Sequence, residues 1–347
     1  MVKTRYFFFA SVAAVILGFF FWAIYSPKND IHEVIARKLE SESTKSDVAF
    51  NIVTFSEVSD GIKYWQLNAA SSTINKTTGI AYLSIVDGVF YRDGQPTLKF
   101  LAPKAVWQMN KKEISLIEPF GYDVRSEQEL KEEIKKIGGV KRLFSYFSLP
   151  SEKPESKSKG YWFKSKRLEW KLSTKKLYCE GGIMLTKGDI TIKAKNLEAD
   201  TGLEKVMLTG ETSAMLYSEK DRSRINITAT SFLVDSKIDM VYAYDNVGIK
   251  SKSASIYSIN AIYDQKDKKI ALIEGVILSS KDINAWSDFA TYSLSDYIAE
   301  LSGNARATKG ESELQGEKII VLTEEGRLFV LGRSKAKIHE SEIEKLQ

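Results

Sequence analysis

From residue 48 onward, apolar and polar residues alternate in short runs that are separated by Gly, Asn, Asp and Lys-Lys pairs. These runs are rich in Ile, Val, Thr, Tyr and Phe, which is typical of brief β-strands joined by turns. In one run, Ile190 and Ile192 fall on one face, and the apolar positions continue in the other phase from Leu197. The phase change at Asn196 predicts a bulge or bend within the strand.

The runs belong to a repeat in which each unit has a small residue at a fixed place. Successive small residues lie 27 to 35 positions apart, except for one gap of 63, and a turn residue follows each small one after 16 to 19 positions. Such a period accommodates two strands and two turns, so we expect a mainly β fold, an elongated antiparallel β-jelly-roll of about eight two-strand repeats. The small residues are Ala69, Ala102, Ser165, Ala194, Ala229, Ser258, Ala285 and Gly316, and the turn residues are Gly88, Pro119, Gly181, Gly210, Asn246, Gly275, Gly303 and Gly332.

A different pattern occupies the start of the chain. Residues 6–25 contain no charged side chain, and this length suffices for a transmembrane helix across a hydrocarbon core of roughly 30 Å. Lys3 and Arg5 precede the segment, which predicts a cytoplasmic N-terminus and an exported body. We expect an uncleaved single-pass anchor in a bacterial inner membrane, with the body in the periplasm. A cleaved signal peptide is the alternative, although its apolar region is usually shorter.

Composition shifts divide the chain into parts. A polar stretch follows the anchor, and a charged stretch interrupts the repeat after its second unit. The interruption opens with the spacing of a helix capping box, and it is either a surface insertion on the sheet or a flap that faces a membrane or a partner. We expect these divisions: 1–27 as cytoplasmic tip and anchor, 28–47 as stalk, 48–217 as a first β-domain with the insertion 126–160, and 222–338 as a second β-repeat domain.

Charge and chemistry argue against several function classes. The 50 Lys and Arg and the 45 Asp and Glu are spread along the chain, unlike the clustered basic face of a nucleic-acid binder. Cys179, His32 and His339 are the whole supply of cysteine and histidine, too few for a Cys-based metal cluster or a catalytic triad. We expect no enzyme activity, no cofactor and no metal. A carbohydrate-active enzyme with paired carboxylates is the enzymatic alternative, but the acidic residues fall mostly in turns or beside Lys.

The order of these features is similar to a known family. Behind the anchor and stalk, the first segments resemble the LptC family, the membrane-anchored periplasmic subunit of the lipopolysaccharide export system. Later units resemble the OstA-like repeats of the periplasmic bridge protein LptA, as though a bridge-like part were fused behind the first. The segments are DGIKYWQLNAA (60–70), LSIVDGVFYRDG (83–94), LKFLAPKAVW (98–107), IKAKNLEAD (192–200) and IALIEGVILS (270–279).

The resemblance implies an open, twisted β-jelly-roll whose edge strands pair with those of partner proteins. It also implies a function, which is to pass lipopolysaccharide from the permeases of an ATP-binding-cassette (ABC) transporter along an apolar groove toward the outer membrane. The implied partners are lipopolysaccharide, the inner-membrane permeases and a periplasmic bridge protein. The alternative is a membrane-anchored periplasmic scaffold or adhesin with a closed core and no lipid conduit.

An apolar groove has a physical purpose, because moving ten methylenes of an acyl chain through water costs about 8 kcal/mol. The alternating repeat supplies an apolar face at every strand. Each groove candidate could equally be an ordinary core residue, and the candidates are Trp65, Leu67, Phe100, Trp107, Ile192, Leu197, Ile227, Phe232, Ile283 and Phe289.

The strongest terminal hairpin signal is Ile319–Leu331, built around Glu325-Gly326. An open jelly roll has unpaired edge strands, and a neighbour's strand satisfies their backbone groups while it extends the sheet. We therefore expect this hairpin to form the outer edge where a bridge protein docks, with Ile319, Val321, Leu328 and Val330 as its apolar side chains.

Overall fold

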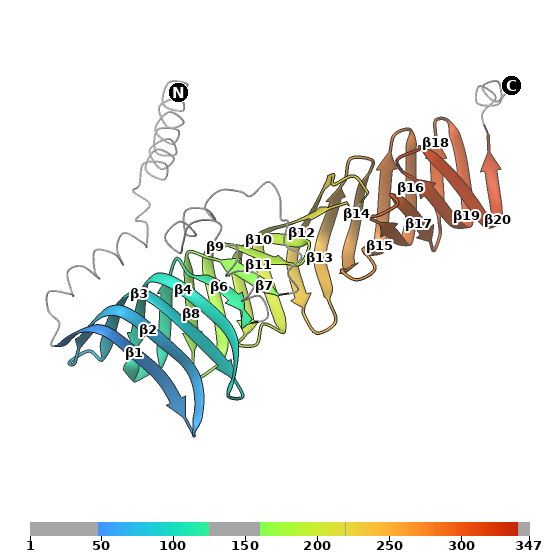
Figure 1. The fold of residues 1–347 in the computed structure, drawn as a ribbon. Coiled ribbons are helices and arrows are strands. Elements are labelled where there is room, and N and C mark those ends of the chain that lie inside the picture. Colours follow the sequence, from blue (N-terminus) through green and yellow to red (C-terminus); the bar gives the residue numbers. More distant parts are fainter. Residues whose placement is uncertain (1–47, 125–159, 219, 339–347) are drawn as a thin grey trace, which may run out of the picture. The chain divides into compact units, whose positions relative to one another are not determined.

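The computed structural model describes residues 48–124, 160–218 and 220–338. These residues form one sheet of 20 strands (Figure 1). All of the described strands belong to one compact unit that begins at Val48. A single turn of 3-10 helix, η1 (Met109–Lys111), joins two of the strands.

The strands before the undescribed stretch at 125–159 are β1 (Val48–Ser59), β2 (Ile62–Asn75), β3 (Ile80–Arg92), β4 (Gln95–Gln108), β5 (Glu113–Ile117) and β6 (Phe120–Asp123). The strands after it are β7 (Tyr161–Lys164), β8 (Arg167–Lys171), β9 (Lys176–Lys187), β10 (Ile190–Asp200), β11 (Lys205–Tyr217), β12 (Arg224–Asp235), β13 (Met240–Lys250), β14 (Ser255–Asp264), β15 (Lys269–Ser280), β16 (Ile283–Ser293), β17 (Ile298–Ser302), β18 (Arg306–Lys309), β19 (Ser312–Leu322) and β20 (Arg327–Lys337).

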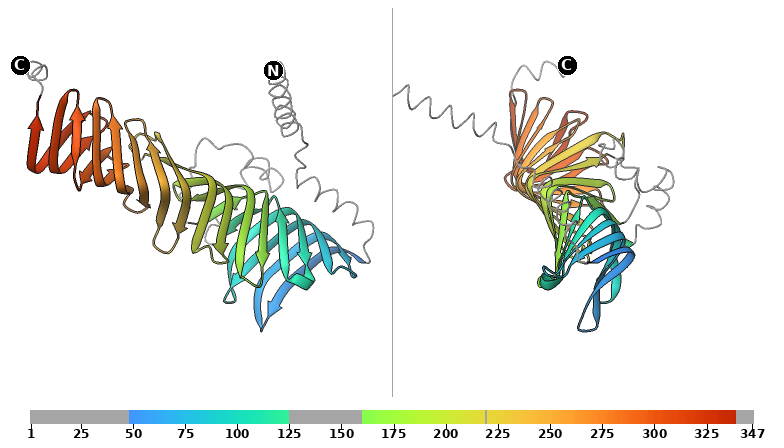
Figure 2. Two further views of the ribbon diagram at one scale, coloured as in Figure 1. Left: turned by 180° about the vertical axis from the view of Figure 1, so that it is seen from behind. Right: turned by 90° about the vertical axis from the view of Figure 1, so that its left-hand side faces the viewer.

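The sheet is antiparallel throughout and follows chain order, as the colours of Figure 2 show. Three positions in the ladder are each filled by two short strands that lie end to end: β5 with β6, β8 with β7, and β17 with β18. β1 pairs with β2 alone and β20 with β19 alone, among the described strands. The sheet therefore has two free edges, one at each end of the ladder.

Most long strands carry a bulge near their middle. The register shifts at this point in seven successive pairs from β9–β10 to β15–β16, and again in β19–β20. Gly210 and Gly275 mark two of the bulges with φ of +77° and +61°, a conformation that favours glycine. The aligned bulges bend the sheet lengthwise, and we call their column the bend line. It divides each strand into two arms.

The bend line also explains the small residues of the repeat. Of these residues, Ser165 and Ser258 each donate a hydroxyl hydrogen bond to the carbonyl oxygen two residues later, at 3.1 and 2.9 Å. In β16 the same bond, at 2.8 Å, is made by Ser287, two positions after the predicted small residue Ala285. These bonds satisfy carbonyl groups where the ladder is interrupted. Ala194 and Ala229 take the equivalent place in β10 and β12. Small side chains are required there because the two arms converge.

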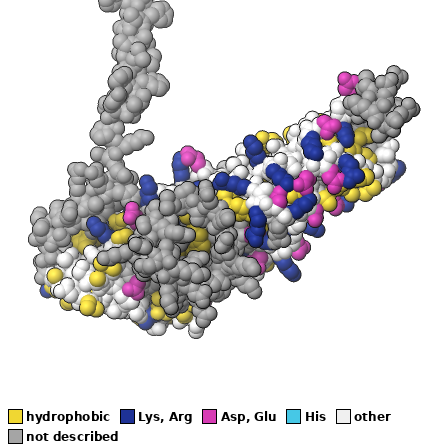
Figure 3. Space-filling model, turned by 45° about the horizontal axis from the view of Figure 1, so that its top comes forward, with side chains coloured by type: hydrophobic (Ala, Val, Ile, Leu, Met, Phe, Trp, Pro, Cys, Tyr) yellow, Lys and Arg dark blue, Asp and Glu magenta, His cyan; other side chains and the backbone are white. Residues whose placement is uncertain are grey.

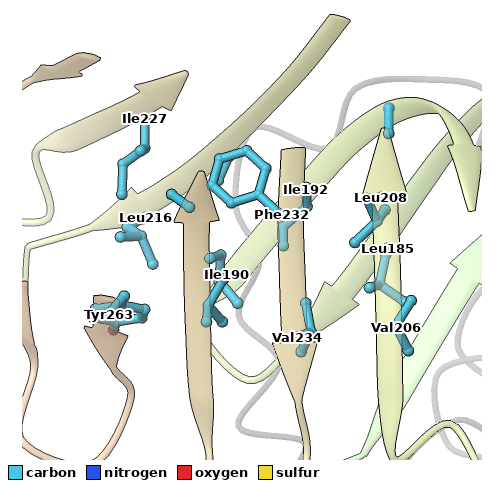
Figure 4. Close-up of a cluster of buried hydrophobic side chains, with 14 of the residues drawn as sticks. Leu185, Ile190, Ile192, Val206, Leu208, Leu216, Ile227, Phe232, Val234 and Tyr263 are labelled. Atoms are coloured by element: carbon cyan, nitrogen blue, oxygen red, sulfur yellow. The ribbon is translucent and has the colours of Figure 1, made fainter. Parts of the chain in front are cut away.

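Arm A denotes the strand halves that end at the β9–β10, β11–β12, β13–β14 and β15–β16 turns, together with the halves of the other strands that continue the same ladder on that side of the bend line. Arm B denotes the halves that end at the β10–β11, β12–β13, β14–β15, β16–β17 and β19–β20 turns. Buried apolar side chains from both arms form one contiguous cluster between them. Figure 4 shows part of this cluster, with Ile192, Leu208 and Phe232 among the labelled side chains. The interior between the arms is the core of the unit.

One prediction about local structure needs correction. Six of the eight expected turn residues lie inside strands instead: Gly88 in β3, and, at the bend line, Gly181 in β9, Gly210 in β11, Asn246 in β13, Gly275 in β15 and Gly332 in β20. A glycine or asparagine suits a bulge as well as a turn, since both need unusual backbone angles. The chain reverses instead at the strand ends, for example between Asp235 and Met240.

The predicted fold class is also corrected. A β-jelly-roll arrangement is consistent with the folded sheet, but the described structure does not contain the transmembrane helix of the predicted fold: no helix in the described part of the chain is long and apolar enough to cross a membrane. The prediction used the length and hydropathy of residues 6–25 alone, and that segment lies outside the described residues.

The predicted divisions 1–27 and 28–47 also lie outside the described residues, as does the insertion 126–160 apart from Gly160. The boundary between 48–217 and 222–338 stays a prediction. At that place β11 and β12 pair from Lys205–Asp235 to Tyr217–Arg224. The ladder is therefore continuous across the proposed boundary.

Candidate functional site

The interior between the arms contains nine of the ten groove candidates. Eight of them are at most 3% exposed: Trp65, Leu67, Phe100, Ile192, Leu197, Ile227, Phe232 and Ile283. Trp107 is half-buried and packs against the same cluster. These nine side chains therefore lie on the inward face of the sheet. Whether any of them contacts lipid stays a prediction.

Phe289 does not join them, because its side chain is 51% exposed. In β16 the buried positions before the bend are Ile283, Ala285 and Ser287, whereas those after it are Ala290 and Tyr292. The inward face thus changes phase at the bend line. Simple alternation misses this change, and it assigns Phe289 to the wrong face.

The inward side chains form two continuous apolar rows that run across the strands. Each residue of a row is the cross-strand partner of the next. The row in arm B (the B row) begins at Leu197 and ends at Ile319, and the row in arm A (the A row) begins at Ile192 and ends at Ala307. The B row is Leu197, Leu208, Phe232, Ala243, Ala261, Leu272, Ala290, Leu301 and Ile319, all at most 4% exposed. The A row is Ile192, Ala214, Ile227, Ile249, Ile256, Leu278, Ala285 and Ala307, all at most 3% exposed.

Both rows run perpendicular to the strands, along the length of the interior. Each row continues from strand to strand at the spacing of neighbouring strands, about 4.8 Å. Its side chains are aliphatic apart from Phe232, and no charged residue interrupts it. Together the two rows form a pair of facing apolar surfaces that extend from β10 to β18 or β19.

The mouth opposite the bend line is bridged by polar contacts between the arms. Asp189 in the β9–β10 turn accepts bonds from Tyr263 and Lys268 of arm B, each at 2.6 Å. Lys187 pairs with Asp239 at 2.7 Å. Closer to the N-terminal end, Arg92 pairs with Glu204 at 2.8 Å. We call this line of contacts the rim.

The largest rim cluster joins four turns. Asp221 and Lys252 belong to arm A, and Tyr297 and Glu324 to arm B. Tyr297 donates its hydroxyl to Asp221 at 2.6 Å, and Lys252 pairs with both carboxylates. Lys220 adds a second ion pair to Glu324.

Each charged group in this cluster favours its partner's ionised form. Hydrogen bonds from Lys252 and Tyr297 hold the pKa of the Asp221 carboxyl well below its usual range. The two carboxylates raise the pKa of the Lys252 ammonium, and Lys220 and Lys252 lower the pKa of Glu324. Burial is the main cause that raises the pKa of the Tyr297 hydroxyl. At neutral pH the cluster is therefore fully charged and holds the two arms together.

The outer surface differs from the interior. On the face that Figure 3 shows, Lys and Arg side chains alternate with Asp and Glu side chains over the described strands. Exposed ion pairs between neighbouring strands include Lys195–Glu211, Lys318–Glu300 and Arg333–Glu317. Such exposed pairs contribute little to stability, and they agree with a solvated surface.

The predicted docking hairpin is present as β19 and β20. Gly326 donates its backbone N–H to the carbonyl of Leu322 at 2.9 Å, which closes the turn at Glu325-Gly326. Ile319 and Val321 are fully buried in β19, whereas Leu328 and Val330 of β20 are partly buried against the core. The free edge is therefore β20, and its role in docking stays a prediction.

Sequence reasoning missed two parts of this arrangement. The first is the rim, whose residues read as ordinary solvated turn residues; Asp189 and Lys268 are 79 positions apart. The second is the free edge at β1, where Val53 and Phe55 are partly buried against the core. The alternation over 48–59 could have indicated this strand, but nothing local shows that its outer side lacks a neighbour.

Burial separates two phenylalanines that the sequence treats alike. We expect Phe232→Ala to lower the free energy of unfolding by about 3–5 kcal/mol, because it empties a fully buried place in the B row. Phe289→Ala should cost less than about 1 kcal/mol, since the ring is half in solvent. Denaturant unfolding of the two variants measures the difference. Equal losses would contradict the assignment of the two faces.

The residues that form the rows are similar to a known protein family. Residues 163–327 match a family model. Its description is LptA/(LptD N-terminal domain) LPS transport protein, where LPS denotes lipopolysaccharide. The matched range contains all of β8–β19, and with them both apolar rows and most of the rim. The OstA-like part of the predicted resemblance is thus supported for these residues.

Other comparisons add less. No curated protein matches the chain. Among solved structures, the chain is similar to LptH from Pseudomonas aeruginosa, described as the LptA homologous periplasmic component of the conserved lipopolysaccharide transport device. The two are 12% identical, with a TM-score of 0.29, and the match covers 32% of this chain and 80% of LptH.

Proposed function

We propose that this protein carries lipopolysaccharide in the periplasm, as a non-catalytic component of lipopolysaccharide transport. The proposal rests on one overlap between the family match and the structure. The residues that match the LptA/LptD N-terminal model are also the residues that form the two facing apolar rows. An acyl chain laid between the rows exchanges water for aliphatic side chains along its whole length.

Lipid entry requires the arms to separate. The interior is filled by its own side chains, and the rim bridges its mouth. We propose that the rim contacts break in turn as lipid advances, while acyl chains replace contacts between the A row and the B row. The exposed ion pairs of the rim, such as Lys220–Glu324 and Lys252–Glu324, are individually weak, so breaking them costs little compared with the apolar area that the lipid buries; the buried Lys187 and Tyr297 add to the cost of opening.

Transfer to a partner uses the free edges. We propose that β20 pairs with an edge strand of an LptA-like bridge protein, which would continue the ladder and both rows into the partner. In the LptC-like form of this proposal, lipid reaches the β1 end from the permeases of an ABC transporter. The apolar side chains Val53 and Phe55 at β1, and Leu328 and Val330 at β20, face the two ends of the interior.

A closed scaffold or adhesin is the second candidate. It is favoured by the rim itself, since the cluster of Asp221, Lys252, Tyr297 and Glu324 closes the mouth in the described structure. A scaffold would keep this contact permanently and would bind no lipid.

Competition binding tests the proposed function. Fluorescent lipopolysaccharide is titrated with the full-length protein, and two unlabelled competitors are compared: intact lipopolysaccharide and the same molecule stripped of its acyl chains. We expect saturable binding that only the intact competitor displaces, because the interior recognises acyl chains. Absence of binding, or equal displacement by the deacylated sugar, would favour the scaffold or adhesin.

A further inference from the structure

Three indole groups in the N-terminal part of the interior have no hydrogen-bond partner. The Nε1 atoms of Trp65, Trp107 and Trp170 are buried and meet no acceptor among the described residues. Buried tryptophans usually place this N–H on an acceptor, because an unpaired buried donor costs about 1–3 kcal/mol. Three such donors in one region are unfavourable in a purely apolar core.

The three rings come from both arms and lie close together. Trp107 in β4 and Trp170 in β8 share one cross-strand row of arm B, with Ile114 between them. Trp65 in β2 reaches Trp107 from arm A, with ring centroids 5.2 Å apart and the planes at 87°. Phe90 is the cross-strand partner of Trp65 and lies 6.0 Å from Trp170.

An edge-to-face contact does not replace an acceptor. The perpendicular rings of Trp65 and Trp107 allow at most an N–H···π contact, which is weaker than an N–H···O bond. Trp170 packs against Phe90 and Tyr64, at centroid distances of 6.0 and 5.9 Å, and neither pair is perpendicular. The donors therefore retain most of their hydrogen-bonding capacity.

The rest of the interior lacks this chemistry. The A and B rows from β10 onward consist of aliphatic side chains and Phe232, none of which donates a hydrogen bond. Trp286, in the C-terminal part, lies outside the buried cluster, with the Arg306 guanidinium 5.4 Å from its ring. A hydrocarbon chain alone would suit the rows, but it would leave the three indoles unpaired.

We propose that the interior between β2, β4 and β8 binds the carbonyl groups of acyl esters or amides, through the indole N–H groups of Trp65, Trp107 and Trp170. This region would hold the junction where the acyl chains of a lipid join its polar part, and the rows beyond would hold hydrocarbon. The inference rests on the proposed function and specifies its ligand as an acyl ester or amide rather than an apolar molecule of any kind.

The rim over this region gives the junction a way in. Tyr64 of arm A lies over Trp170, and the Lys175 ammonium of arm B is 5.3 Å from the Tyr64 ring. Glu57 and Lys112 make a second contact across the mouth at 3.5 Å. Lys112 and Lys175 are both exposed, so these two contacts across the mouth are individually weak.

A pair of lipids that differ only in the carbonyl group tests the proposal. The full-length protein is titrated with a short-chain diester glycerophosphocholine and with its diether analogue, both below their critical micelle concentrations. We expect the diester to bind about 10-fold more tightly, since one to two net hydrogen bonds correspond to that ratio. Binding is followed by tryptophan fluorescence and confirmed by calorimetry.

Single Trp→Phe variants identify the donors. Trp65→Phe, Trp107→Phe and Trp170→Phe should each reduce diester affinity about 3- to 10-fold and leave diether affinity unchanged, which also shows that the variant is folded. Trp286→Phe is the matched control and should alter neither affinity. Equal binding of diester and diether by the unsubstituted protein would overturn the inference.

Failure of this inference is distinguishable from failure of the proposed function. If lipopolysaccharide binds and is displaced by its intact form, but the two glycerolipids bind equally or not at all, the carbonyl site is wrong and the lipid-carrying role stands. If lipopolysaccharide also fails to bind, both are wrong.

Discussion

A disulfide across the rim should abolish lipid uptake. Ser253 of the β13–β14 turn and Thr323 of the β19–β20 turn face each other from opposite arms, with their hydroxyl oxygens 2.8 Å apart. In the Ser253→Cys/Thr323→Cys variant, an oxidised bond would prevent the arms from separating at this point. We expect oxidation to lower the binding of lipopolysaccharide at least 10-fold and reduction to restore it.

The chain is well suited to this experiment. Its one native cysteine, Cys179, is buried in the core, and burial raises the pKa of its thiol to about 12. The thiol therefore stays protonated and does not compete for the new disulfide.

A second disulfide within one arm serves as the matched control. Thr186 and Thr191 are cross-strand partners in the β9–β10 hairpin, and their hydroxyl oxygens are 3.1 Å apart. The Thr186→Cys/Thr191→Cys disulfide staples neighbouring strands of arm A and leaves the mouth free, so oxidation should not change binding. Normal lipid uptake by the oxidised cross-rim variant would mean that the arms need not open there.

Proline in β20 should abolish pairing with a bridge protein without unfolding the body. Along an edge strand, successive backbone N–H groups point alternately to the neighbouring strand and outward. Phe329 and Val330 are adjacent in β20, where they pair with Ile320 and Ile319 of β19. One of Phe329→Pro and Val330→Pro therefore removes a bond to β19, and the other removes an outward donor.

Each variant is the control for the other, because both introduce proline into β20 and only one of them removes an outward-pointing N–H group. The variant that loses an outward donor should keep its thermal unfolding midpoint and lose at least 10-fold in co-purification with an LptA-like bridge protein. The other variant should mainly loosen the β19–β20 hairpin. If the variant with an unchanged midpoint still co-purifies at the original level, β20 is not the docking edge.

The fold was predictable where local pattern determines it. The phase change at Asn196 predicts a bulge, and the register of β10 does shift between Ala194 and Asn196. The same device operates in β16, but there alternation places Phe289 inside, because no phase change was assigned. The local sequence shows that side chains alternate between the two faces of a strand. It is a less reliable guide to the position of the bulge at which the inward face changes phase.

The rim and the indole cluster were beyond sequence reasoning for another reason. Tyr297 and Asp221 are 76 positions apart, and Trp65 and Trp107 belong to opposite arms. Their meeting depends on how the two arms cross after the sheet bends. That geometry is set by sheet twist and by the summed bulges, and no single segment encodes it.

The most direct test of lipid carriage is photo-crosslinking in intact cells. A diazirine-bearing aliphatic residue replaces Ile192, Ile227 or Phe289 in turn, and adducts are detected with an antibody against lipopolysaccharide. The account predicts ATP-dependent adducts at Ile192 and Ile227, which face the interior, and none at Phe289, which is exposed. Adducts at Phe289 alone, or none at Ile192 and Ile227 in a folded protein, would contradict transport between the arms.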